Sequence, residues 1–288
     1  MKLLIPMYSL IGLLAAINLV HGRIAVGSSP PPEPSGMLTL VIGGIVAAQP
    51  IIVGSWLVYG AGSLMFRFLV VASWSAILCG ALLFGYSIAF GESAFDSSAR
   101  TARGSPLAVL AVAATMASAK FFRGQSVTRP LTSNGIGVSG NQVSISDIMV
   151  ITAMVGLAIA VLPPAGEVPG YAALGIAWGV YALATLMVFF PAFSLALGAE
   201  ESSFRRDSIP ALFITAFVAL TFAATFAISI VLVIIVMITG DGPVPEDVFA
   251  MIFLICIGVS LPVSMWLCAL RMAGVRVDRL KSRKPLKK

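Results

Sequence analysis

The stretch that decides the fold is Met37–Tyr59, MLTLVIGGIVAAQPIIVGSWLVY, in which no side chain carries a charge. It is longer than the roughly 20 apolar residues that an α-helix needs to cross a ~30 Å hydrocarbon layer. Inside a bilayer the backbone N–H and C=O groups must be bonded within the segment, because no water is there to bond them. The stretch is therefore predicted to be a membrane-spanning helix.

The same pattern repeats along the chain. Charged residues are absent between Glu33 and Arg67, between Glu167 and Glu200, and between Asp207 and Asp241. The 288 residues are 59% hydrophobic and 10% charged, whereas a soluble domain carries about 25% charged residues. We predict an all-α fold, a polytopic bundle of about eight transmembrane helices. The predicted spans lie near residues 3–20, 37–59, 68–90, 106–122, 147–162, 170–197, 209–239 and 248–270.

Two of these spans leave alternatives open. Residues 3–20 could form a signal sequence, but the polar Asn18 and the lack of a small-x-small cleavage site favour an uncleaved span. Residues 106–122 are short and could be re-entrant or interfacial, which would leave seven spans. The loops between the spans are short, so we predict one transmembrane domain over residues 1–270 and a basic tail over residues 271–288.

Basic residues set the predicted orientation, since short loops rich in Lys and Arg stay in the cytoplasm. With eight spans and both termini inside, 15 of the 18 basic residues lie on the cytoplasmic side. If residues 106–122 do not cross, the N-terminus moves outside and the count becomes 16 against 2. Charge therefore places the C-terminal tail in the cytoplasm in either version and does not choose between them.

Aromatic residues near the predicted span ends fit the same picture. Trp56 and Tyr59 close the second span, Tyr86 lies near the end of the third, and Trp266 lies near the end of the last. Trp and Tyr are enriched where a membrane meets water. We therefore predict that these four residues lie at the membrane interfaces.

Residues that carry chemistry are scarce. No Asp, Glu, Lys or Arg lies near the middle of a predicted span, which argues against ion-coupled transport and voltage sensing. The single histidine, His21, is interpreted as an interfacial, solvated side chain and cannot form a two-histidine metal motif. Cys79, Cys256 and Cys268 lie in apolar runs and show no disulfide or zinc-ligand spacing. We predict no catalytic residues, no cofactor, no metal and no enzymatic activity.

Proline and polar residues interrupt two spans and supply the candidate site residues. Gln49 and Pro50 lie in the second span, and Ser260, Pro262 and Ser264 lie in the last. A proline removes a backbone hydrogen bond and kinks a helix, and a glutamine can bond to a neighbouring helix. Broken helices line the substrate sites of some transporters, but plain kinks with packing hydrogen bonds are the favoured interpretation here.

A small-residue motif, Gly175-Ile-Ala-Trp-Gly179, lies in the sixth predicted span, and Pro191 offers a further break there. Glycines four residues apart let two helices approach closely in lipid. Because the chain has 27 glycines, packing within the chain is favoured over a dimer interface. Gly175 and Gly179 are thus the candidate packing residues.

The tail from Arg271 to Lys288 holds eight bases and one acid, Asp278. Each base near an anionic membrane surface contributes about 1 kcal/mol of attraction. The tail contains no aromatic residue, so nucleic-acid binding is not expected. The predicted contacts with anionic lipid head groups are Arg271, Arg276, Arg279, Lys281, Arg283 and Lys284.

Two stretches resemble a known group of proteins. In one, Ala47–Pro50 is followed by Trp56 and then by Arg67; in the other, Val143–Asp147 leads into Ile151–Ala153. Both resemble segments of uncharacterised multi-pass membrane proteins of planctomycete-type bacteria. The resemblance implies a location in a bacterial membrane, and we predict the cytoplasmic (inner) membrane. It supplies no activity, substrate or catalytic residue.

Two classes of function remain. The first is a non-catalytic membrane component or scaffold, which contacts other membrane proteins through small-residue faces and the basic tail. The second is a permease or channel-like protein that moves a neutral or lipid-like solute past Gln49, Pro50 and residues 260–264. The lack of buried charges disfavours the second class, although an apolar substrate needs none. We predict the first.

Overall fold

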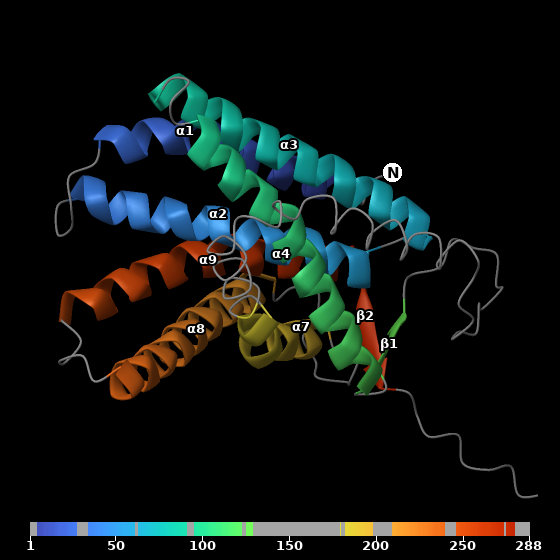
Figure 1. Ribbon diagram of the computed structural model, residues 1–288. Helices are drawn as coiled ribbons and strands as arrows, with labels where there is room; N and C mark the ends of the chain where they lie inside the picture. The colour runs from blue at the N-terminus through green and yellow to red at the C-terminus, as the bar shows by residue number, and fades with distance from the viewer. Residues whose placement is uncertain are drawn as a thin grey trace, which may run out of the picture.

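The computed structural model describes residues 5–27, 34–60, 63–90, 95–122, 125–128, 179, 182–197, 209–239, 246–273 and 275–279 (Figure 1). Its elements are helices with one two-stranded sheet. The helices are α1 (Ile5–Gly27), α2 (Pro34–Tyr59), α3 (Leu64–Phe90), α4 (Phe95–Phe122), the π-helix η2 (Thr185–Phe189), α7 (Phe190–Leu197), α8 (Ile209–Thr239) and α9 (Glu246–Met272). The strands are β1 (Gln125–Thr128) and β2 (Arg276–Arg279).

Four of these helices are long and apolar enough to cross a membrane, and they agree with four of the predicted spans. They are Ser35–Tyr59, Leu64–Ala89, Ile209–Ile230 and Asp247–Met272. Shorter apolar helices occupy Met7–His21, Ala108–Lys120 and Ala182–Leu197, and each overlaps one of three further predicted spans. The predicted span at residues 147–162 lies outside the described residues. The helical, apolar bundle supports a membrane-embedded protein.

Three helices pass through a proline. The sequence places the first turn of the fourth span at Pro106, but α4 begins 11 residues earlier, at Phe95. Likewise α2 continues through Pro50 and α9 through Pro262, so α9 has no break at residues 260–264. A proline costs one hydrogen bond and some strain, and in a bundle the neighbouring helices and local adjustments compensate for that cost. A proline alone therefore does not locate a helix end here.

The helices run in alternating directions. Ser55 bonds to Trp266 and Gly44 packs against Gly258, so α2 and α9 are parallel. Figure 1 shows α1 and α3 starting at the end of the bundle where α2, α4 and α9 finish. Successive helices from α1 to α4 therefore run antiparallel to one another.

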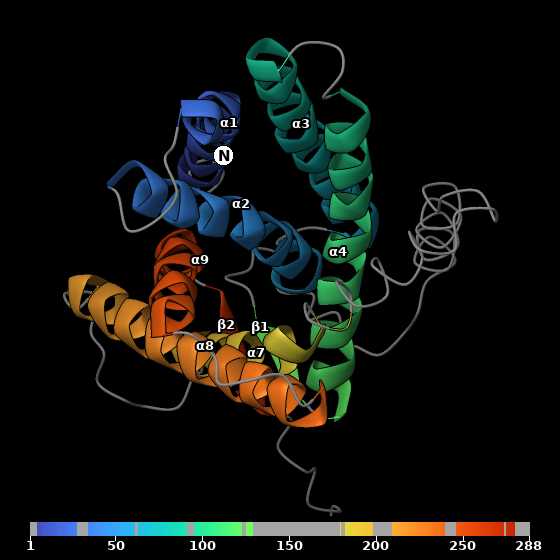
Figure 2. The same cartoon turned by 60° about the vertical axis from the view of Figure 1, so that its left-hand side comes forward.

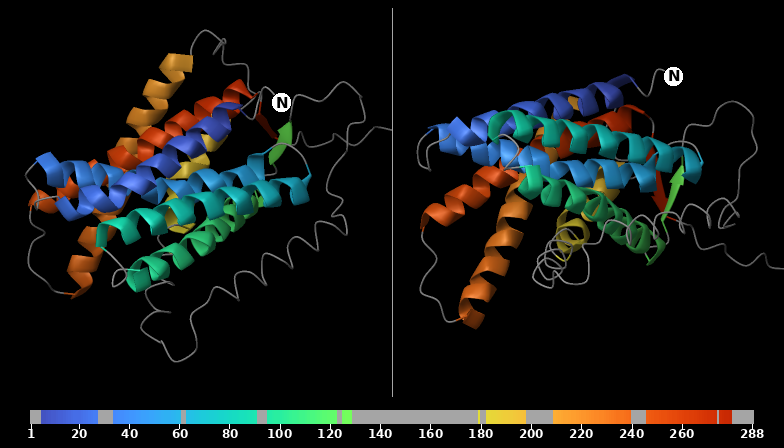
Figure 3. Two further views of the ribbon diagram at one scale, coloured as in Figure 1. Left: turned by 90° about the horizontal axis from the view of Figure 1, so that it is seen from above. Right: turned by 45° about the horizontal axis from the view of Figure 1, so that its top comes forward.

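Helix α8 lies at the edge of the bundle. Figure 2 shows α1 and α3 on one side of α2 and α9, and α8 on the other. Both views of Figure 3 show α8 crossing the other helices at a steep angle. Of the 18 most apolar consecutive residues of α8, 17% are buried, against 50% in α2. Most of the surface of α8 therefore faces whatever surrounds the protein.

The two-stranded sheet was not predicted from the sequence. The strands pair antiparallel, with Val127 opposite Val277 and Thr128 opposite Arg276. Because β1 follows α4 and β2 follows α9, the sheet ties together the ends of two helices. The start of the predicted basic tail is thus part of the folded structure.

Candidate functional site

A hydrogen-bonded pair of side-chain amides joins the first three helices. Asn18 of α1 donates to Gln49 Oε1 (3.0 Å) of α2, and Gln49 Nε2 donates back to Asn18 Oδ1 (2.6 Å). Asn18 Nδ2 also donates to the carbonyl of Leu78 in α3 (2.9 Å). Asn18 is fully buried and Gln49 nearly so. The expected bond from Gln49 to a neighbouring helix is present, and we call Asn18, Gln49 and the Leu78 carbonyl the amide node.

Three tryptophans meet at the centre of the bundle, one each from α2, α3 and α9. The ring centroids of Trp56 and Trp74 lie 5.5 Å apart, those of Trp56 and Trp266 5.9 Å, and those of Trp74 and Trp266 5.8 Å. The indole N–H of Trp266 donates to Ser55 Oγ (2.8 Å). We call Trp56, Trp74 and Trp266 the tryptophan cluster; tilted and edge-to-face contacts of this kind stabilise beyond simple burial.

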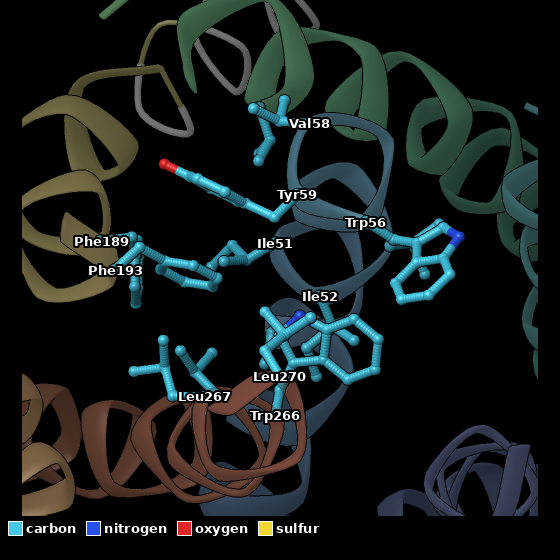
Figure 4. Close-up of a cluster of buried hydrophobic side chains, with 14 of the residues drawn as sticks. Ile51, Ile52, Trp56, Val58, Tyr59, Phe189, Phe193, Trp266, Leu267 and Leu270 are labelled. Carbon is cyan, nitrogen blue, oxygen red and sulfur yellow. The ribbon is translucent and has the colours of Figure 1, made fainter. Parts of the chain in front are cut away.

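Three of the four aromatics predicted at the membrane interfaces, Trp56, Tyr59 and Trp266, pack inside the protein and do not face outward. Trp56 and Tyr59 expose at most 2% of their surface, and Trp266 is fully buried. Figure 4 shows Tyr59 lying against Phe193 of α7, and the two rings stack with centroids 5.5 Å apart. Position near the end of a span is compatible with either an interface or a packed interior, and here the neighbouring helices cover the rings.

His21 is also not solvated as predicted. It exposes 9% of its surface, and its ring contacts Tyr86 edge-on at a centroid distance of 5.7 Å. The helix face that carries Asn18 turns His21 toward α3, because the two residues are three positions apart in α1. His21 and Tyr86 therefore belong to the α1–α3 interface.

The closest helix crossing uses glycines that the sequence analysis did not select. A Cβ on Gly44 of α2 would overlap the backbone of Ile255 and Gly258, and a Cβ on Gly258 of α9 would overlap the carbonyl of Val41. At Gly179, by contrast, a Cβ would meet nothing within 4 Å. Gly175 lies outside the described residues. The crossing of α2 and α9 thus depends on Gly44 and Gly258, and Gly179 presents an open face.

Ser260 and Ser264 are fully buried on α9, and neither hydroxyl has a hydrogen-bond partner in the described part of the chain. They do not line a helix break, since α9 is continuous. In the sixth predicted span, the π-helix η2 ends at Phe189, and Pro191 is the second residue of α7. A π-turn widens the helix just before a proline, which relieves the clash of its ring with the preceding turn.

Arginines bond to the C-terminal ends of two helices. Arg67 Nη1 donates to the carbonyls of Leu57 and Val58 in the last turn of α2. Arg271 Nη1 donates to the carbonyl of Ala196 near the end of α7 (3.1 Å). The last carbonyls of a helix have no partner within the helix, and a cation there also interacts favourably with the helix dipole. Arg271, selected as a lipid contact, has this structural bond as well.

The remaining predicted lipid contacts divide into two groups. Arg276 and Arg279 lie in β2, where they pair with Thr128 and Gln125. Lys281, Arg283 and Lys284 lie outside the described residues. Because α2 and α9 are parallel and the sheet joins the ends of α4 and α9, the described bases Arg67, Lys120, Arg271, Arg276 and Arg279 share one end of the bundle.

Within the described residues, no three His, Cys, Asp or Glu side chains come close enough to hold a metal ion. No family model, curated protein or solved structure matches this chain. The function is therefore argued from the geometry of the bundle.

Proposed function

We propose that the protein is a non-catalytic component or scaffold of a bacterial cytoplasmic membrane. The observation that carries the proposal is the composition of the described interior. The tryptophan cluster fills the centre of this interior, and the two side-chain amides of the amide node, Asn18 and Gln49, are bonded to each other. Such an interior holds the helices together through specific contacts between side chains, which is the feature that supports a structural role.

The proposal places the basic end of the bundle in the cytoplasm, with about eight spans and both termini inside. Arg67, Lys120 and Arg271 gather at the end of the bundle that carries the sheet, as expected where positive loops stay inside. Arg276, Arg279 and the bases that follow them would contact anionic lipid head groups.

Cysteine labelling tests this orientation. Ser63 and Asp247 are both exposed, and they lie at opposite ends of the bundle. In intact cells, a membrane-impermeant maleimide should label Asp247→Cys and spare Ser63→Cys, with the unaltered chain giving the background of its three native thiols. Labelling of Ser63→Cys alone would reverse the proposed orientation.

The open face at Gly179 is the proposed contact with another membrane protein. A small residue whose Cβ meets nothing leaves room for a partner helix to approach. After crosslinking and mild detergent extraction, one reproducible partner should copurify with the wild type and be lost with Gly179→Leu. Gly12 on α1 is equally open, so Gly12→Leu is the matched control and should keep the partner. Recovery of the chain without a partner in all three samples would count against a scaffold.

A permease or channel-like protein for a neutral or lipid-like solute is the second candidate. The observation that favours it is the pair of buried hydroxyls at Ser260 and Ser264, which have no partner in the described residues. Proteoliposomes containing the protein would then take up glycerol faster than empty liposomes, and Ser264→Ala would slow the uptake. Equal rates with and without protein would remove support for glycerol-like solutes.

A further inference from the structure

A row of four small polar side chains follows one ridge of α9 at intervals of four residues. Residues spaced in this way lie above one another on a helix surface. At one end of the row Cys256 is hydrogen-bonded to Thr225 of α8. At the other end Cys268 Sγ lies 4.0 Å from the carbonyl of Ile209, the first residue of α8. The row consists of Cys256, Ser260, Ser264 and Cys268, and both of its ends contact α8.

The two serines in the middle of the row, like Thr185 of η2, lack the hydrogen bond that several other hydroxyl residues of the described helices make. Several Ser and Thr side chains donate to the carbonyl four residues earlier in their own helix, at 2.8–2.9 Å; these are Thr39, Ser73, Thr115, Thr221 and Thr225. Ser260 and Ser264 are fully buried and make no such bond. A buried hydroxyl without a partner costs stability, so both groups are available as donors to an acceptor that enters the interface.

The opposite wall of this interface is the least covered helix of the bundle. Phe222 and Phe226 of α8 are 65% and 69% exposed, and Figure 2 shows α8 on the outer side of α9. A molecule dissolved in the bilayer can therefore approach the α8–α9 seam from the side without crossing the rest of the bundle. Since the row carries no acidic or basic side chain, a charged ligand would be desolvated without compensation.

We propose that Ser260 and Ser264 are the hydrogen-bond donors of a binding site between α8 and α9. The ligand class is an uncharged, lipid-soluble molecule that carries a carbonyl oxygen and an aliphatic chain. This site is separate from the proposed scaffold role, because a ligand that binds between α8 and α9 needs no protein partner and is not transported.

The test measures the thermal unfolding of the purified full-length chain in detergent with two matched probes. Methyl decanoate has an ester carbonyl, and undecane has a similar chain without an acceptor. With the wild type, methyl decanoate should raise the Tm by about 2–4 °C more than undecane does, as expected for a ligand at roughly ten times its Kd. This difference should vanish in the double variant Ser260→Ala/Ser264→Ala.

Ser73→Ala is the control, because Ser73 is an exposed residue of α3 that bonds to its own helix. It should keep the full difference between the two probes. Ser264→Cys, which keeps the size of the side chain and weakens the donor, should reduce the difference and gives a second readout if the double variant fails to fold. An equal response of the wild type to both probes, or an undiminished ester response in the serine variants, would overturn the proposal.

Discussion

Replacing Gln49 by leucine removes one half of the amide node, and the energetic result can be worked from its three hydrogen bonds. The substitution deletes the two bonds between Gln49 and Asn18 and leaves the buried Asn18 Oδ1 without its donor. Interhelical hydrogen bonds in membranes are worth about 0.6–2 kcal/mol each, and an orphaned buried polar atom costs about 1–3 kcal/mol. Gln49→Leu should therefore lower the free energy of unfolding by about 2–4 kcal/mol.

A double-mutant cycle separates the bond from the effect of the leucine itself. Asn18→Leu should cost at least as much as Gln49→Leu, because Asn18 also loses its bond to the Leu78 carbonyl. The double variant leaves no amide unpaired, so its cost should fall short of the sum of the two by about 1–3 kcal/mol. The assay is unfolding with sodium dodecyl sulfate in mixed micelles, followed by tryptophan fluorescence.

The control cycle pairs Gln49→Leu with Ser73→Ala, because Ser73 bonds only within α3 in the contacts described. Effects at sites that share no partner add within about 0.5 kcal/mol. If the Asn18 and Gln49 variants were equally additive, or if Gln49→Leu left stability unchanged, the reasoning that the node holds three helices together would be refuted.

Three further outcomes are expected. Arg67→Met removes the donor to the last carbonyls of α2 and should lower the free energy of unfolding by about 1–3 kcal/mol in the same assay. Arg67→Lys should lower it less, and an unchanged stability of Arg67→Met would contradict the capping role. Gly258→Leu forces a side chain into the backbone of α2, so size-exclusion chromatography should show aggregate. A Cβ added at Gly80 would meet no atom within 4 Å, so Gly80→Leu should elute as the wild type does. Acrylamide should quench the emission of a Trp178→Phe variant weakly, because its three remaining tryptophans form the buried tryptophan cluster; strong quenching would instead support rings at the membrane surface.

Several parts of the interior could be read from the sequence only in outline. Gln49 was selected because a glutamine in an apolar run needs a partner, and the structure supplies one. The partner itself, Asn18, served only as an argument that the first helix is retained. Gly258 is the only glycine in α9, a signal that could have marked the crossing with α2. The Gly175-xxx-Gly179 motif drew attention instead because it matches a familiar spacing.

The basic end of the bundle shows a second limit of prediction from sequence. A sequence pattern identifies Arg271, Arg276 and Arg279 as positive charges near a membrane, and it treats them alike. The structure separates them, because Arg271 bonds to the end of α7 while Arg276 and Arg279 lie in β2. The strand partners are about 150 residues apart in the chain, and the short strands carry too few apolar residues to show a period.

Composition alone is enough to predict an apolar environment and most of the described helices. Inside a bilayer, long runs without charge have no water to bond their backbone, so they form helices whichever helices pack beside them, and this local requirement is visible in composition alone. Only the tertiary structure decided which side chains meet: the amide node, the tryptophan cluster, the glycine crossing and the serine row. Every face of a membrane helix is apolar, so hydropathy does not tell the buried face from the lipid face, and specific contacts between helices make that choice.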